Sequence, residues 1–307
     1  MSAVATRLRR PTRTARHRAE GRPIDGILLV DKPAGSTSHD VVNHARRALH
    51  TRRIGHAGTL DPFATGLLVL LVGNATRLLP HLDGEPKVYE ATIAFGTETD
   101  TDDVTGSVTR RTDLPDATAV RHAIASLTGT IAQVPPAYSA KQVGGRRAYQ
   151  VARRGDSLAL APVSVTVNAW DVRSLTKDRL DATITCGGGT YIRALARDLG
   201  RLCGSAAHLS ALRRTRSGPF DVAEALSLDT LRSGEASPRP SIAAVPHLPA
   251  ISLSADDVIH VRQGRAIAAV ESDPATSVAL TDESGNLVAV AERAASTWQP
   301  RVVLPHA

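Results

Sequence analysis

The most constraining feature of the chain is a glycine-rich segment at residues 55–66 that runs directly into an apolar stretch. Its sequence is Gly-His-Ala-Gly-Thr-Leu-Asp-Pro-Phe-Ala-Thr-Gly. The glycines permit backbone conformations that residues with a Cβ avoid, and Pro62 fixes its own φ and drives Asp61 toward an extended conformation. Six apolar residues follow at 67–72, which predicts a strand buried on both faces. The segment is therefore expected to hold one carboxylate on a rigid loop beside the core.

Asp61 is the candidate catalytic residue of this loop. A stiff loop anchored next to the core is a good position for a catalytic group, because its geometry is fixed by the scaffold. The alternative is that Asp61 only braces a turn, since Asp-Pro pairs commonly open turns. The loop taken by itself leaves both interpretations open.

Charge is distributed unevenly along the 307 residues. The net charge is +7, but residues 1–22 carry seven arginines and one glutamate, a net +6, which leaves +1 (7 − 6) for the rest. We expect residues 1–22 to be disordered, because they are arginine-rich and have little to bury. Two further basic blocks, at 141–154 and 193–216, predict a polyanion-binding face with nucleic acid as the partner. The alternative is a set of ordinary solvated faces.

Several classes of protein are disfavoured by the sequence. No apolar run approaches the roughly 18 residues of a membrane span. The arginine-rich N-terminus lacks the apolar core of a secretory signal. Cys186 and Cys203 have no CxxC spacing and no neighbouring histidines, so we expect buried thiols in a reducing cytoplasm and no metal site. The glycine run 187–189 lacks the spacing of nucleotide-binding loops.

Hydrophobic periodicity predicts mixed strands and helices between residues 23 and 233. The expected strands are 26–33, 67–72, 87–95, 162–167 and 180–186, and the expected helices follow Thr37, cover 116–128 and run from about Arg193 to Leu199. The stretch 98–105 is rich in Asp and Thr and fails the template of a calcium-binding loop, so a solvated turn is expected there.

The C-terminal part is expected to be a separate module. Residues 234–250 are rich in Pro and Ser and indicate a linker. Residues 251–307 indicate a short β-rich module, with strands expected at 258–262, 278–280 and 287–290. The expected organisation is thus a disordered tail (1–22), a large domain (23–233), the linker and the module.

Residues 55–62 resemble the signature loop of the TruB family of tRNA pseudouridine synthases. Further stretches resemble other motifs of that family: Asp-Lys-Pro at 31–33, Lys-Val-Tyr-Glu-Ala at 87–91, Gly-Thr-Tyr-Ile-Arg at 189–193 and the stretch from His208 to Phe220. One departure is Gly187, where a serine is expected. The resemblance implies an α+β fold with a mixed, mainly antiparallel sheet and flanking helices, followed by a PUA-like RNA-binding domain.

The resemblance also implies roles for individual residues. Asp61 is expected to be the nucleophile, Arg193 its ion-pair partner and Tyr89 the ring that stacks on the target base. The residues expected to contact or support that base are Lys32, His56, Tyr191 and Leu212. Without the resemblance, the commoner interpretation of Tyr89 is a half-buried strand aromatic. His56 could equally be a hydrogen-bonded turn histidine.

An insertion at about 133–156 resembles the thumb-like RNA-clasping element of the family. It combines prolines, glycines and two tyrosines with positive charges, among them Lys141, Arg146 and Arg147. These three are expected to bind the phosphate backbone. The alternative is a structural loop with incidental charge.

The implied function is isomerisation of uridine to pseudouridine at position 55 in the T-loop of tRNA, with an aspartate nucleophile and a flipped base. This isomerisation needs no cofactor and no metal, and we expect a cytoplasmic monomer that binds the T-arm. The alternative is a non-catalytic RNA-binding or RNA-folding protein on the same scaffold. The residues leave open whether Asp61 attacks C6 of the uracil or C1′ of the ribose.

Overall fold

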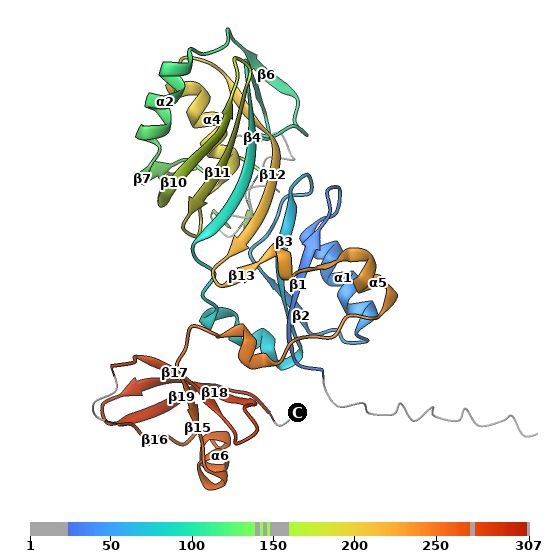
Figure 1. The fold of residues 1–307 in the computed structure, drawn as a ribbon, viewed down its shortest axis with the longest axis vertical. Helices are drawn as coiled ribbons and strands as arrows, with labels where there is room; N and C mark the ends of the chain where they lie inside the picture. Colours follow the sequence, from blue (N-terminus) through green and yellow to red (C-terminus); the bar gives the residue numbers. More distant parts are fainter. Residues whose placement is uncertain (1–23, 139–141, 144–145, 148–159, 271–273, 306–307) are drawn as a thin grey trace, which may run out of the picture.

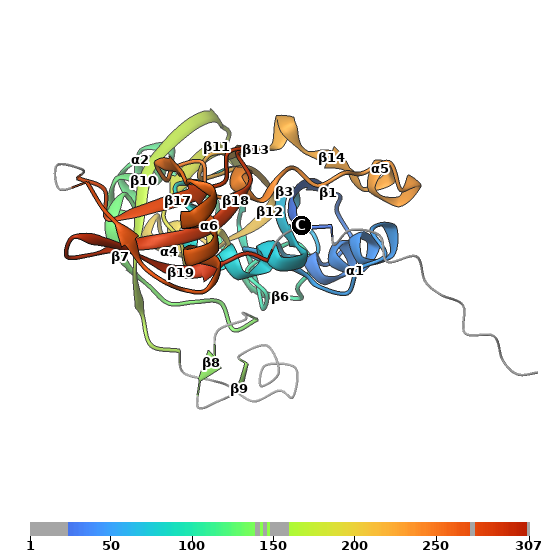
Figure 2. The ribbon, with the colours of Figure 1, turned by 90° about the horizontal axis from the view of Figure 1, so that it is seen from below.

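The computed structural model describes residues 24–138, 142–143, 146–147, 160–270 and 274–305. The predicted disordered tail, Lys141 and most of the predicted RNA-clasping insertion lie outside these ranges. Of the insertion, β8 (Gln142–Val143) and β9 (Arg146–Arg147) pair with each other. Figure 2 shows them set apart from the body of the fold.

One large mixed sheet organises the described residues between Gly26 and Ser233 (Figure 1). Its strands are β1 (Gly26–Lys32), β2 (Ile54–Ala57), β3 (Thr65–Val72), β4 (Lys87–Phe95), β7 (Gly129–Gln133), β10 (Val163–Leu175), β11 (Arg179–Cys186), β12 (Ala207–Ser217), β13 (Phe220–Asp221) and β14 (Leu226–Ser227). Their order is β14-β1-β3-β12-β4-β11-β10-β7, with β2 beside β3 and β13 beside β12. Only β1–β14 and β3–β12 pair in parallel among these strands. The predicted α+β fold with a mainly antiparallel sheet is confirmed.

The strand β3 is buried on both faces, as its apolar run predicts. Leu68, Leu70 and Val72 pack with α1 (Ser38–Ala48) and α5 (Leu228–Ser233) on one face. Leu67 and Val69 belong to a second cluster on the opposite face. The helix α1 follows Thr37 as predicted, and Thr37 forms a capping box with Asp40.

The other half of the sheet carries its own core. The strands β4, β10, β11 and β12 pack against α2 (Ala117–Ser126) and α4 (Ile192–Leu202). Figure 1 shows both helices beside this half of the sheet. The predicted helix beginning near Arg193 is confirmed and extends to Leu202, and the strand expected at 162–167 continues to Leu175. None of the helices described has the length and apolar character needed to cross a membrane.

The stretch 98–105 contains turns at 100–101 and 104–105, but the prediction that it is solvated is wrong for three of its four carboxylates. β5 (Thr97–Thr99) pairs with β6 (Val108–Arg111), and the segment that follows β5 folds back against β12 and α4. Glu98, Asp102 and Asp103 are buried. Composition alone misleads here, because three of the four arginines that pair with these carboxylates lie about a hundred residues further along the chain, and only Arg110 is near in sequence.

The C-terminal residues form a small sheet with one helix. Its elements are β15 (Ala250–Ser252), α6 (Ala255–Arg262), β16 (Ile267–Ala268), β17 (Ser277–Thr281), β18 (Leu287–Ala294) and β19 (Thr297–Val303). The strands predicted at 278–280 and 287–290 are present, but the strand predicted at 258–262 is wrong. That segment is the end of α6, where Ser254 caps the first turn and Asp256 and Asp257 favour a helix N-terminus.

The segment predicted as a linker packs along the large sheet. It contains η3 (Ser241–Ala244), and Arg239 exchanges backbone hydrogen bonds with Ile27 of β1. Beyond it, Val290, Val302 and Leu304 join the cluster that contains Leu67 and Val69. The small sheet therefore shares an apolar core with the large one.

Candidate active site

The glycine-rich loop lies where the two halves of the large sheet meet. It connects β2 to β3, and β3 pairs with β12 only at Thr65–Arg213 and Gly66–Arg214. The loop is held from the α1 side by two contacts. Gly35 N donates to Pro62 O at 2.8 Å, and Ser38 Oγ both accepts from Leu60 N (2.9 Å) and bonds Leu60 O (3.1 Å). Asp61 is thereby fixed at the junction.

Lys32 supports the same loop from inside the protein. It is fully buried, and its Nζ donates to Ser36 O (2.7 Å), Pro33 O (3.0 Å) and Pro62 O (3.4 Å). Burial lowers the pKa of Lys32 to about 8, although the charge of Asp61 acts in the opposite direction. Lys32 thus holds the backbone around Asp61 and does not line the cavity beside it.

Asp61 and Arg193 form a two-pronged ion pair. Arg193 Nε donates to Oδ2 of Asp61 at 2.9 Å and Nη2 donates to Oδ1 at 3.0 Å. Arg193 is in the first turn of α4 and is 5% exposed, so the pair is screened little by solvent. The planar guanidinium therefore fixes the orientation of the carboxylate as well as its charge.

The remaining donors of Arg193 are used by other segments. Nη1 donates to Thr101 O (2.8 Å), Nη2 also donates to Tyr138 O (2.9 Å), and Nε lies 3.6 Å from Oδ2 of Asp103. Two carboxylates thus share one arginine. Burial, the largest influence, raises the pKa of Asp61, and the nearby Asp103 adds to it, while Arg193 lowers that pKa. The cost of desolvation therefore outweighs the effect of Arg193 on the pKa of this carboxyl.

A cavity of about 280 Å³ opens beside this ion pair. The lining combines Asp61, Arg193, Tyr89 of β4, Leu212 of β12 and Tyr191. Tyr89 and Leu212 are each 7% exposed, so they form an apolar floor under the polar groups. Five of the predicted site residues, from four separate segments, therefore meet around one small cavity.

Tyr191 is positioned by a residue that sequence reasoning missed. Gln133, at the end of β7, accepts from Tyr191 N (2.9 Å) and donates to Tyr191 O (3.1 Å). Gln133 is fully buried, so its amide is committed to this contact. A polar residue at the end of a short strand is a weak signal, and the contact joins segments far apart in the sequence.

Other predicted site residues lie outside the cavity or outside the described residues. His56 lies in β2, and its buried Nδ1 has no hydrogen-bond partner among the residues described. Burial, and then the charge of Arg214, lowers the pKa of His56, which favours the neutral ring. The structure gives only the backbone of Arg146 and Arg147, and Lys141 lies outside the described residues.

The arginines of the block 193–216 do not form the predicted phosphate-binding face. Three of them are buried: Arg193, Arg197 and Arg214. Two more pair with carboxylates, Arg201 with Glu98 and Arg213 with Asp31. The block is mainly an internal network, so its charge is a poor guide to a nucleic-acid-binding surface.

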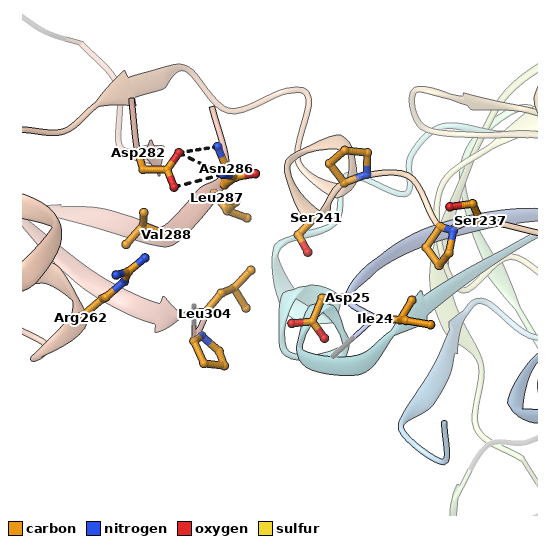
Figure 3. Close-up of a pocket in the computed structure, with 13 residues that line it drawn as sticks. Ile24, Asp25, Ser237, Ser241, Arg262, Asp282, Asn286, Leu287, Val288 and Leu304 are labelled. Carbon is orange, nitrogen blue, oxygen red and sulfur yellow. Dashed lines mark hydrogen bonds between the residues drawn. The ribbon is translucent and has the colours of Figure 1, made fainter. Parts of the chain in front are cut away.

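A second cavity, of about 390 Å³, lies between the two sheets (Figure 3). It is lined by Asp25 and Ser241 on one side and by Arg262, Asp282 and Leu304 on the other. Asp25 is engaged by Asn74, and Asp282 by Asn286, so its carboxylates already have partners. It brings together no group resembling the pair of Asp61 and Arg193.

The smaller cavity places one carboxylate beside an aromatic ring. Among the described residues, no group of three or more His, Cys, Asp or Glu side chains could hold a metal ion. Asp61 carries the carboxylate, and Tyr89 offers a ring face to a planar ligand. An ionised carboxylate beside a flat apolar wall can attack an electrophilic carbon of a bound base or sugar.

Comparisons with known proteins agree over most of the chain. Residues 46–192 match the family model of the TruB family pseudouridylate synthase N-terminal domain, and residues 193–238 match that of the tRNA pseudouridylate synthase B C-terminal domain. The chain is 46% identical to tRNA pseudouridine synthase B of Thermobifida fusca, over 91% of this chain and 98% of that protein. It is 43% identical to the protein of the same name from Mycobacterium sp. (strain KMS), over 91% and 96%.

A chain with the same fold occurs in a solved structure of an H/ACA RNP. An H/ACA RNP bound to a substrate RNA containing 2′-deoxyuridine contains a chain that superposes with a TM-score of 0.66 at 24% identity, covering 91% of this chain and 85% of that one. This likeness shows the fold. The two family models and the sequence relatives show the family, and the chain belongs to the TruB family of pseudouridylate synthases.

Proposed function

We propose that this enzyme converts uridine to pseudouridine in the T-loop of tRNA, at position 55, with Asp61 as the nucleophile. The observation that carries the proposal is the two-pronged pair of Asp61 and Arg193 at the cavity that Tyr89 lines. The relatives named tRNA pseudouridine synthase B support tRNA as the substrate class.

In this mechanism each cavity residue has one task. Arg193 keeps the carboxylate of Asp61 oriented and favours its ionised form. Tyr89 stacks on the uracil, and Tyr191 and Leu212 enclose it. Flipping the nucleotide costs a few kcal/mol of stacking, and the neutral ring of His56 fills the vacated space.

The partner surface extends beyond the cavity. Lys141, Arg146 and Arg147 of the insertion bind the phosphate backbone of the T-arm, and residues 251–307 act as a PUA-like RNA-binding domain. The enzyme acts as a monomer in the cytoplasm, where its tRNA substrate is made and used. Selection of the uridine comes from the shape of the loop, because structured RNA is read largely by shape and unstacked bases.

The proposal is tested with an unmodified tRNA transcript carrying uridine tritiated at C5. Isomerisation replaces the C5–H bond with a C5–C1′ bond, so turnover releases tritium to water. The wild type is expected to release one equivalent per tRNA, and none from a transcript with cytidine at position 55. Release that continues from the cytidine transcript would contradict the assignment to position 55.

The nucleophile is tested by Asp61→Asn, which is nearly isosteric but not nucleophilic. Tritium release should be abolished while tRNA affinity stays within a few fold, because the amide retains the shape of the loop. Retained turnover would remove Asp61 from this role. A wild-type protein that binds tRNA without releasing tritium would support the alternative, a non-catalytic RNA-folding protein.

A further inference from the structure

Arg214 is a buried cation of the active-site cavity with no carboxylate partner among the residues the structure describes. It is 1% exposed, and it donates from Nε to Leu67 O (2.8 Å) and from Nη2 to Gly58 O (3.0 Å). The other buried arginines differ: Arg193 pairs with Asp61 and Asp103, and Arg197 with two further carboxylates. Taking a charge out of water without a counter-ion costs several kcal/mol, and two carbonyl acceptors offset only part of it.

The loop is built around this guanidinium. A Cβ on Gly58, where φ is +84°, would lie 3.2 Å from Arg214 Nη1. A Cβ on Gly66, where φ is +101°, would lie 2.2 Å from the carbonyl oxygen of Arg214. Two glycines of the segment 55–66 are therefore required where the chain passes Arg214. A smaller apolar residue at position 214 would fill part of the space without the free-energy cost of desolvating a charge. Packing alone therefore does not explain a cation at this position.

The positive charge acts on groups around the cavity. Burial lowers the pKa of Lys87 and of His56, and Arg214 lowers both further. Burial raises the pKa of Tyr89, whereas the charge of Arg214 lowers it. The charge of Arg193 is shared between two carboxylates, so Arg214 and Lys87 supply the uncompensated positive potential in the cavity lining.

Both chemical routes place negative charge on the uracil ring. If Asp61 attacks C1′, the N1–C1′ bond breaks and its electron pair leaves with the base, delocalised over N1, O2 and O4. If Asp61 adds to C6, the electron pair of the C5–C6 double bond moves onto C5 and O4, and the N1–C1′ bond then breaks with its electron pair staying on N1. In either route C5 then bonds to C1′, Asp61 is released, C5 loses its proton to solvent and N1 gains one. A cation fixed beside the base favours the charged state by either route.

We propose that Arg214 stabilises the negative charge that develops on the uracil before its C5 bonds to the ribose. The inference rests on the proposed function and assigns to the cavity a second cation with a task distinct from that of Arg193. Arg193 orients the nucleophile, whereas Arg214 faces the base. Removing a preorganised group of this kind typically lowers the rate of the chemical step about 10²- to 10³-fold.

The test uses single-turnover kinetics on a T-arm hairpin and on the same hairpin with 5-fluorouridine at the target position. Fluorine makes the uracil ring a better carrier of negative charge, so the fluorinated base depends less on an external cation. Consumption of the target nucleoside is followed by nuclease digestion and mass spectrometry. The variants are Arg214→Gln, Arg214→Lys and the control Arg213→Gln, which removes an arginine of the same strand that pairs with Asp31.

We expect Arg214→Gln to lose about 10²-fold or more on uridine and at least about tenfold less on 5-fluorouridine, with KM within a few fold. Arg214→Lys keeps the charge and should lose no more than about tenfold on uridine. Arg213→Gln should behave as wild type on both substrates. An equal loss of Arg214→Gln on the two substrates, or none, would overturn the inference and leave Arg214 a structural residue.

Thermal melts separate misfolding from lost catalysis. If Arg214→Gln does not fold, Arg214→Lys decides alone: a loss within about tenfold on uridine supports the inference, and a loss of about 10²-fold or more overturns it. A wild-type enzyme that forms no pseudouridine would overturn the proposed function, and this inference with it. If the wild type forms pseudouridine and Arg214→Gln is equally active, this inference is overturned and the proposed function is not.

Discussion

Two opposing influences act on the protonation of Asp61. Burial raises its pKa, and Arg193 is the strongest of the groups that lower it. A nucleophilic carboxylate must be ionised, so the rate should fall as the pH drops through this pKa. Arg193→Gln removes the lowering influence, so the pKa should rise and the acid limb of the single-turnover rate should move to higher pH. The measurement is that rate as a function of pH for the two proteins.

Arg193→Lys is the control for charge without the two-pronged contact. Its acid limb should move less than that of Arg193→Gln, because a cation remains near Asp61. Its plateau rate should still be low, because an ammonium is a point charge that cannot bond both carboxylate oxygens. An acid limb that is unchanged in Arg193→Gln would mean that another group controls the profile.

At this scale the sequence predicted the cavity residues but not the groups that position them. Asp61, Tyr89 and Arg193 stand out because each belongs to a motif. Gln133 and Arg214 fall within stretches that the sequence singled out, the insertion and the motif at 208–220, but neither was assigned a role at the cavity. Their contacts join segments far apart in the chain. Such partners become visible only when the segments are brought together.

The helix α4 and the acidic segment after β5 form one unit. Arg193, Arg197 and Arg201 recur every four residues on α4, so they lie along one face of it. They bond in turn Thr101 O, Asp102 and Glu98. The sequence shows both halves of this ladder as charged stretches, but neither half indicates that the other is its partner. The prediction of a solvated turn failed for that reason.

Stability measurements should show that Arg197 and Arg201 contribute unequally to the free energy of unfolding. Arg197 is buried and bonds Oδ2 of Asp102 at 2.9 Å. Arg197→Gln leaves that carboxylate buried without a cation, so it should cost about 3–5 kcal/mol in the free energy of unfolding. The Arg201 side chain is 54% exposed, so Arg201→Gln should cost about 1 kcal/mol or less. Denaturant unfolding measures both, and equal losses would contradict this description.

At the scale of the whole molecule, the charge of residues 1–22 should affect the affinity for tRNA but not the rate of the chemical step. Residues 1–22 hold a net +6 and lie outside the described residues. Phosphate contacts release counter-ions, so tRNA affinity should fall log-linearly with salt concentration. Deleting 1–22 should reduce that slope slightly and leave kcat unchanged, because an arginine-rich tail of this kind rarely makes six stable contacts. Salt titrations of tRNA binding, with kcat measured in parallel, test this. A large drop in kcat would place the tail in the catalytic step.

The C-terminal module should contribute to stability and to substrate binding at once. Val290, Val302 and Leu304 of the module share a cluster with Leu67 and Val69 of β3. Deleting residues 251–307 uncovers that apolar surface, so the melting temperature should fall.

The same deletion should raise KM for whole tRNA more than for an isolated T-arm hairpin, which does not reach the module. Kinetics on both substrates, below the melting temperature of the shortened protein, separate the two effects. Losses that are equal on whole tRNA and hairpin would mean that the shared core is the module's only contribution. A larger loss on whole tRNA would show that the module binds RNA that the hairpin lacks.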